Sequence, residues 1–252
     1  MPNFEINSLE ELQRLWDGKS ADVAKLINET LTAQTNANPR LKALRDFVEQ
    51  NAYGMGERSF LAMWEIILDE VYHTSPRKLW PVLMEIGVHR GQILAAWRII
   101  RPHSWIIGLS PFDGAEMGDT RDYRQDLTEL FKQFDLIEPD VLIHGYSDAP
   151  NIIQWFQEQY KVNQALDVLY IDGGHSYETT RSDIEVYSPY VIPGGFLVID
   201  DSANRFAYPW GYFSGIASVS KAADHCLPPG TTNDQWEHIG AVVHNRIWRK
   251  KF

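Results

Sequence analysis

The chain has 252 residues and a single cysteine, Cys226. No disulfide bond can form within such a chain, and no zinc site made of several thiolates is possible. The sequence also has no uninterrupted apolar run of the roughly 18 residues that cross a membrane, and its first residues lack the apolar stretch of a signal peptide. These absences predict a cytoplasmic protein with no membrane partner.

Basic residues are few. The chain has 23 Lys and Arg against 34 Asp and Glu, a net charge of −11. Because a protein that binds nucleic acid must neutralise phosphates with a basic face, we expect no nucleic-acid partner. Hydrophobic residues make up 44% and charged residues 23%, as in ordinary globular proteins with a core of their own.

The first 75 residues have a helical pattern. Ser8 followed by Glu11 is the spacing of a capping box, and apolar residues then recur at helical intervals. The pattern predicts helices over residues 8–16, 40–49 and 59–72. We therefore predict an N-terminal helical extension or lid, residues 1–75, before the main domain, residues 76–252.

From residue 81 onward, short apolar runs alternate with helical stretches. The runs are residues 82–86, 105–109, 140–144, 167–171 and 196–199, and residues 239–248 are expected to form one more strand. This alternation predicts an α/β fold with a mostly parallel sheet and right-handed crossovers. In such sheets, ligands bind where the strands end at their carboxyl edge.

The first strand end carries Glu85, with Gly87 two residues later and Gly91 six residues later, and opens the helix expected over residues 92–100. Glycines at these places allow a tight turn and a close approach of the backbone to a ligand. A helix N-terminus also offers free N–H groups to an anion. An ordinary strand-to-helix turn would explain the glycines alone, but not the acid before them.

Acids also follow the fourth and fifth predicted strands. Asp172 ends one strand, and Asp200 and Asp201 end the next, 28 and 29 residues later. Because neighbouring parallel strands lie about 4.8 Å apart, we expect the three carboxylates to converge. Such a cluster suits Mg²⁺ or another divalent cation, although single acids at strand ends are often helix caps or ion-pair partners. His175 lies three residues after Asp172.

The segment from Glu85 to Gly91 resembles motif I of the class I S-adenosylmethionine-dependent methyltransferases. The acids with His175 resemble the metal-dependent O-methyltransferases that act on sugars and other natural products. The resemblance implies a Rossmann-like, doubly wound, seven-stranded sheet. It implies that Glu85, Gly87 and Gly91 bind the cofactor and that Asp172, Asp200 and Asp201 hold Mg²⁺. Asp172 would also contact the cofactor and serve in catalysis.

The second and third strand ends offer several candidates for binding the nucleoside of the cofactor. The family usually has an acid after the second strand that binds the ribose, but this chain has Ser110. Either Ser110 or Asp113 takes that part, or neither does, and Asp119 is a further candidate nearby. After the third strand, Ser147 and Asp148 resemble the loop that approaches the adenine, and either could instead cap the helix expected over residues 150–160.

The resemblance also implies a mechanism. The metal would bind a substrate hydroxyl and lower its pKa, and His175 would take the proton, although His175 could also act without touching the substrate. Arg58 would bind the methionine carboxylate from a lid made by residues 53–58, which could equally be a simple connection between helices. The aromatic run over residues 205–213 suits stacking on a sugar or a ring, or burial in a dimer.

We therefore predict an O-methyltransferase for a small-molecule acceptor, with a sugar as one candidate and a homo-oligomer as an expected state. Two alternatives keep the fold: a metal-dependent enzyme of a hydroxylation pathway, and a non-catalytic module that binds the cofactor. A nicotinamide dehydrogenase is disfavoured because His89 interrupts the dinucleotide fingerprint and Ser110 replaces the expected acid.

Overall fold

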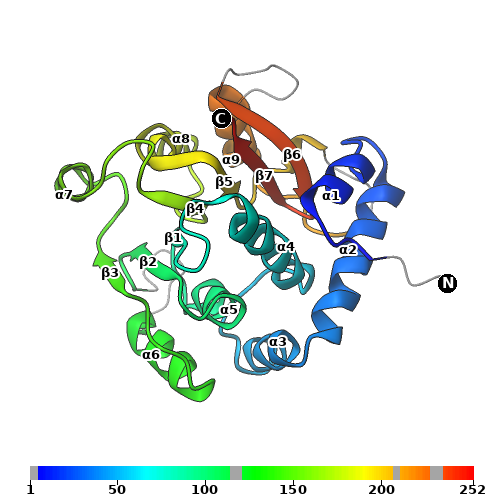
Figure 1. The fold of residues 1–252 in the computed structure, drawn as a ribbon, viewed down its shortest axis with the longest axis horizontal. Coiled ribbons are helices and arrows are strands. Elements are labelled where there is room, and N and C mark those ends of the chain that lie inside the picture. The colour runs from blue at the N-terminus through cyan, green and yellow to red at the C-terminus, as the bar shows by residue number, and fades with distance from the viewer. Residues whose placement is uncertain (1–4, 114–120, 207–210, 228–234) are drawn as a thin grey trace.

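The computed structural model describes residues 5–113, 121–206, 211–227 and 235–252. Its centre is a seven-stranded sheet in the order β3-β2-β1-β4-β5-β7-β6 (Figure 1). The strands are β1 (Val82–Ile86), β2 (Trp105–Ser110), β3 (Val141–His144), β4 (Leu166–Ile171), β5 (Val191–Ile199), β6 (Trp236–Val242) and β7 (Asn245–Lys250). The first five are parallel, whereas β7 runs antiparallel to both β5 and β6. The predicted Rossmann-like, mostly parallel sheet is confirmed.

The prediction of one strand over residues 239–248 was wrong. The chain reverses within this segment, so β6 and β7 form a hairpin. Val243 at the turn has a φ of 53°, a left-handed conformation that β-branched residues seldom adopt. Three polar residues, His244, Asn245 and Arg246, lie at the turn and at the start of β7, but all three are buried and apolar residues flank them in both strands.

Helices cover both faces of the sheet (Figure 1). Two clusters of buried apolar side chains show the division: one joins α1 to α6 with one face, and the other joins α7, α8 and α9 with the opposite face. The helices are α1 (Leu9–Leu15), α2 (Ala21–Ala37), α3 (Pro39–Asn51), α4 (Ser59–Thr74), α5 (Gln92–Ile100), α6 (Tyr123–Gln133), α7 (Pro150–Gln159), α8 (Tyr177–Tyr187) and α9 (Ala217–Cys226). The connections change face between β3 and β4. As a result, β1 and β4 are neighbours at the centre, where strand order reverses.

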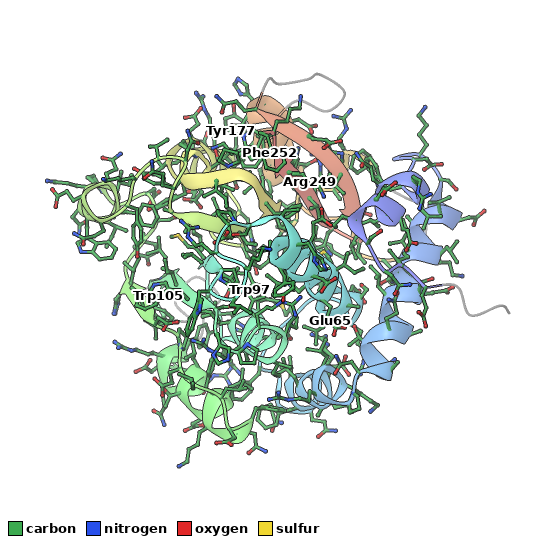
Figure 2. All side chains as sticks on the ribbon, viewed as in Figure 1. Glu65, Trp97, Trp105, Tyr177, Arg249 and Phe252 are labelled. Carbon is green, nitrogen blue, oxygen red and sulfur yellow. The ribbon has the colours of Figure 1, made fainter. Side chains whose placement is uncertain are left out.

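Three N-terminal helices, α1, α3 and α4, begin within one residue of the predicted positions, whereas α2 was not predicted. The Ser8 hydroxyl accepts a hydrogen bond from the Glu11 backbone N–H at the start of α1. In α4, the Trp64 ring packs edge-on against Trp97 of α5 and Tyr170 of β4, with centroids 5.0 and 5.1 Å apart. Side chains fill the space around Trp97 (Figure 2), so the extension shares its core with the sheet. None of the described helices has both the length and the apolar character needed to cross a bilayer.

Candidate functional site

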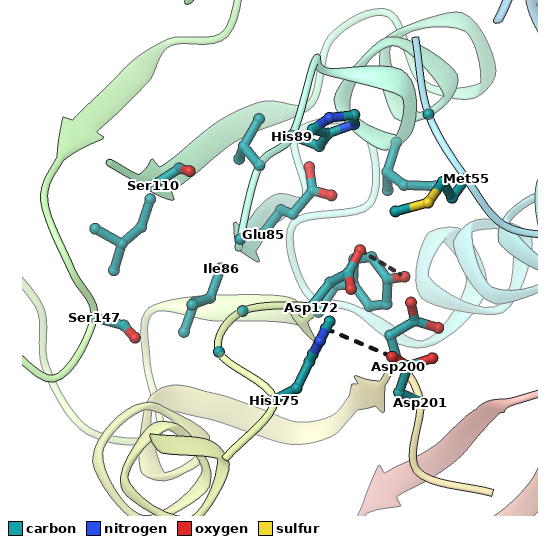
Figure 3. A pocket seen from close by; sticks show the side chains of 18 of the residues that line it. Met55, Glu85, Ile86, His89, Ser110, Ser147, Asp172, His175, Asp200 and Asp201 are labelled. Carbon is teal, nitrogen blue, oxygen red and sulfur yellow. Dashed lines mark hydrogen bonds and ion pairs between the residues drawn. The ribbon is translucent and has the colours of Figure 1, made fainter. Parts of the chain in front are cut away.

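A cavity of about 530 Å³ opens at the carboxyl edge of the sheet. Its walls come from the loops that follow β1 to β5, and residues 53–56 lie against it from the N-terminal extension. Figure 3 shows Ser110 and Ser147 at one end, Asp200 and Asp201 at the other, and Glu85 between them. The cavity therefore lies at the reversal of strand order, where open α/β sheets bind ligands.

The strand period of two brings the acids to one face. In each of three strands, a buried core residue on the α4 face is followed two residues later by an acid, and alternate residues of a strand point to the same side. These pairs are Leu83 with Glu85, Tyr170 with Asp172, and Val198 with Asp200. The acids therefore meet at one rim of the sheet, as predicted from the strand ends.

Glu85 is a buried carboxylate, only 3% exposed. Its Oε2 atom has no hydrogen-bond partner among the described residues. Burial raises the pKa of Glu85 well above its ordinary value, and Asp200 raises it further. A buried, unpaired carboxylate is costly, so a cationic group bound in the cavity would stabilise this part of the protein.

Gly87 and Gly91 both have positive φ angles, 92° and 84°. A Cβ atom on Gly87 would lie 1.9 Å from the carbonyl oxygen of Asp172, so only glycine allows the loops after β1 and β4 to approach so closely. Gly91 is the N-cap of α5, and a Cβ there would press on Leu127 of α6 at 2.8 Å.

The four polar residues after β2 and β3 that were predicted to hold the nucleoside all line the cavity, namely Ser110, Asp113, Ser147 and Asp148. The Ser110 hydroxyl already accepts a hydrogen bond from the Phe112 backbone N–H. Asp119 lies outside the described residues. The predicted helix cap was wrong: α7 begins after Ala149, without a side-chain cap, so Ser147 and Asp148 are not its N-cap.

At the other end of the cavity, burial and the Asp200 carboxylate raise the pKa of Asp172 and Asp201. Burial raises the pKa of Asp172 well above its ordinary value, and Asp200 is the next largest cause. Burial and Asp200 raise the pKa of Asp201 to about 6, although His244 and His175 oppose the change. The Tyr170 hydroxyl donates a hydrogen bond to Asp172 Oδ2 at 3.4 Å.

His244 is a residue that the sequence reasoning missed. Its Nε2 atom lies 3.3 Å from Asp200 Oδ1 and 3.8 Å from Asp201 Oδ1. One potential ligand atom from each of these three residues lies within 4.8 Å of the others. The structure thus adds His244 to the acids at this end of the cavity. Only recognition of the β6–β7 turn would have pointed to His244.

His175 also lies at this end of the cavity. Its side chain is 54% exposed, and its Nε2 atom is 3.5 Å from Asp201 Oδ2 (Figure 3). The backbone carbonyl of His175 accepts a hydrogen bond from the Ser218 hydroxyl of α9. An imidazole that is open to the cavity and held beside a carboxylate is suited to take a proton from a bound molecule.

The structure does not place Arg58 at the cavity. Its guanidinium pairs with Asp46 at 2.7 Å and with Glu49, and donates a hydrogen bond to Asn36. These partners belong to α2 and α3, so Arg58 joins helices of the extension. Tyr53, Gly54, Met55 and Gly56 of the same loop do line the cavity.

Arg90 is the cation that lies in the cavity wall near this loop. It is 2% exposed, its Nε atom is 3.1 Å from Asp126, and it donates a hydrogen bond to the Ala52 carbonyl. In the predicted aromatic run, Phe213 lines the cavity, whereas residues 207–210 lie outside the described part of the chain.

Residues 84–202 match a family model described as a methyltransferase domain. The matched segment begins in β1 and ends just after Asp201, so it contains the cavity's central loops. This segment of the chain is similar to methyltransferase domains. This agrees with the sheet order and with the family resemblance of the sequence.

Solved structures share the fold of this chain at low sequence identity. The O-methyltransferase NovP is 18% identical, with a TM-score of 0.57, and the match covers 80% of this chain and 84% of NovP. MycE methyltransferase from the mycinamycin biosynthetic pathway, in complex with Mg and SAH, is 17% identical with a TM-score of 0.52. That match covers 85% of this chain and 55% of MycE.

One curated protein is similar over a short segment. The uncharacterized protein R132 of Acanthamoeba polyphaga mimivirus is 44% identical over 36 residues, which are 14% of this chain. The match spans 16% of R132, about a sixth of its length.

Proposed function

We propose that this protein is a methyltransferase. It transfers the methyl group of S-adenosylmethionine to a hydroxyl of a small molecule, with the help of a divalent cation. The observation that carries this proposal is the arrangement of one continuous cavity. Its centre holds the unpaired Glu85 carboxylate, and one end holds three acids and His175. A methyl donor and an acceptor can therefore lie next to each other.

The centre of the cavity suits the methionine part of the cofactor. Its ammonium group would neutralise Glu85 and satisfy the orphaned Oε2 atom. Gly87 has no side chain and lies against the Asp172 backbone, so no side chain projects from this position toward the methionine part of the cofactor. The nucleoside would then extend toward Ser110 and Ser147, with Asp113 and Asp148 within the same wall.

The opposite end has the character of a cation site. Asp200 Oδ1 is buried with no hydrogen-bond partner among the described residues, and Asp200 raises the pKa of both Asp172 and Asp201. A divalent cation would relieve this repulsion. Asp172, Asp200 and Asp201 would hold Mg²⁺ or a similar ion, which supplies charge that lowers the pKa of a substrate hydroxyl.

His175 would then accept the proton of that hydroxyl at its Nε2 atom. The Asp201 carboxylate, 3.5 Å away, would stabilise the protonated ring. The hydroxyl oxygen forms the new bond to the methyl carbon as the bond from carbon to sulfur breaks. The leaving group is a neutral thioether and needs no acid, so much of the rate would come from positioning the two reactants.

MycE, whose structure contains Mg and SAH, and NovP, an O-methyltransferase, support this proposal as proteins of the same fold. We keep the sugar as one candidate acceptor, as the sequence predicts. The cytoplasmic location and the homo-oligomer stay predictions from the sequence.

Calorimetric titration with S-adenosylmethionine, with and without Mg²⁺, tests the proposal. We expect micromolar cofactor binding by the parent protein, and a heat of Mg²⁺ binding that disappears in the double variant Asp172→Ala/Asp200→Ala. Cofactor binding without any metal heat would remove the cation from the mechanism. A protein that is folded by circular dichroism but binds no cofactor would overturn the proposed activity.

A further inference from the structure

His244 faces the acids at the end of the cavity. Its side chain is 7% exposed, and its Nδ1 atom is buried with no hydrogen-bond partner among the described residues. Nε2 lies 3.3 Å from Asp200 Oδ1, yet that oxygen also has no hydrogen-bond partner among them. The two atoms therefore face each other at close range without sharing a hydrogen bond.

The fold fixes His244 in this position. Ile199 of β5 pairs with Arg246 of β7 in an antiparallel register, so continuing the register by two residues brings Asp201 opposite His244. The His244 carbonyl accepts hydrogen bonds from the backbone N–H groups of Ser202 and Ala203, at 3.0 and 3.2 Å. The hairpin turn is thereby tied to the loop that carries the two acids.

Aromatic side chains hold the imidazole ring itself. Phe60 of α4 and Phe213 lie edge-on to it, with centroid distances of 4.8 and 5.2 Å. These contacts restrict the ring and keep water from it. A buried polar side chain that is fixed so firmly and lacks partners is expensive, unless a ligand completes its bonding.

The distances fit a metal ion between the donors. Two ligands at about 2.1 Å from a cation, at right angles to each other, lie about 3.0 Å apart. The separation of 3.3 Å between His244 Nε2 and Asp200 Oδ1 is close to that value. One ligand atom each from Asp200, Asp201 and His244 falls within 4.8 Å of the others, as needed for three ligands on one side of an ion.

We propose that His244 supplies a nitrogen ligand to the divalent cation, and that this site therefore prefers a first-row transition ion to Mg²⁺. This inference rests on the proposed function for the presence of a cation, but not for the identity of the methyl acceptor. Mg²⁺ favours oxygen ligands only, whereas imidazole favours transition ions, whose affinities rise from Mn²⁺ to Co²⁺. A site that adds one imidazole nitrogen to the carboxylates would discriminate between these ions.

The first test is electron spin-echo spectroscopy of the Mn²⁺-loaded protein, without substrate. We expect nitrogen modulation in the parent, which changes from the ¹⁴N to the ¹⁵N pattern when the protein is labelled with [¹⁵N]histidine. It should persist in His175→Asn, the matched control, because His175 is the other described histidine beside these acids. It should disappear in His244→Asn.

The second test is calorimetry with Co²⁺ and Mg²⁺. Asn keeps an oxygen donor at position 244, so we expect His244→Asn to lower Co²⁺ affinity at least tenfold and Mg²⁺ affinity less than threefold. The labelled parent protein keeps the spectroscopic test valid even if His244→Asn does not fold, because loss of the signal in His175→Asn would assign the nitrogen to His175 instead.

Three outcomes would overturn the inference. Mn²⁺ binding without nitrogen modulation would leave His244 as an ion-pair partner of the acids and leave the metal proposal intact. Equal losses of Co²⁺ and Mg²⁺ affinity in His244→Asn would show a structural role only. No binding of any divalent ion would remove the cation site itself, and S-adenosylmethionine binding, measured separately, would show whether the methyltransferase proposal survives.

Discussion

Replacing Gly87 with alanine should damage both stability and cofactor binding. The new Cβ would lie 1.9 Å from the Asp172 carbonyl oxygen and 2.3 Å from its carbonyl carbon. These are backbone atoms, so one of the two loops must move. Overpacking costs about 1 to 3 kcal/mol, and a φ of 92° adds about 1 to 2 kcal/mol for a residue with a Cβ. We expect Gly87→Ala to lower the free energy of unfolding by about 2 to 5 kcal/mol.

Gly211 is the matched control. Its φ is 78°, and a Cβ added there would meet no described atom within 4 Å. Gly211→Ala should therefore cost only the conformational part, about 1 to 2 kcal/mol. Urea unfolding followed by tryptophan fluorescence measures both variants, and calorimetry measures their cofactor binding. If the two variants lose equal stability, the close approach of the β1 and β4 loops is not what requires glycine at position 87.

Three further predictions concern single side chains. Glu85→Gln should weaken S-adenosylmethionine binding at least tenfold by calorimetry, because the neutral amide no longer attracts the ammonium group; unchanged affinity would argue against that contact. His175→Asn should lower kcat on an identified acceptor about 100-fold with little change in cofactor affinity, and an unchanged kcat would remove His175 as the base. Burial raises the pKa of Asp183 from 3.8 to about 7, so stability that is present below pH 3.8 is lost as the pH rises through about 7. The pKa change represents about 4 kcal/mol, and we expect Asp183→Asn to recover on the order of 2 kcal/mol of it in the free energy of unfolding at pH 8. The variant should also flatten the dependence of that free energy on pH. An unchanged pH profile would contradict a buried, charged Asp183.

Local pattern was enough for the parallel part of the sheet. The apolar runs predicted β1 at residues 82–86, and the glycines and acids after the runs predicted where the cavity lies. The α5 helix begins and ends where the sequence indicates. These features are local, because strand length, helix period and glycine placement follow from residues that are close in the chain.

The remaining features depend on contacts between distant residues. The sequence around Arg58 does not show which side chains bind its guanidinium. Only the packing of α2 and α3 shows that Arg58 forms an ion pair with Asp46 and donates a hydrogen bond to Asn36.

His244 lies more than 40 residues after the acids that it faces. Polar residues 244–246 interrupt the apolar segment at the β6–β7 turn, but they do not show that His244 returns to the end of β5. The sequence by itself determined the parallel strands, the glycine-bearing loop after β1 and the acids at the rim. Tertiary structure alone decided that Arg58 pairs with α3 and that His244 meets the rim acids, because antiparallel pairing and helix packing join residues that no local pattern connects.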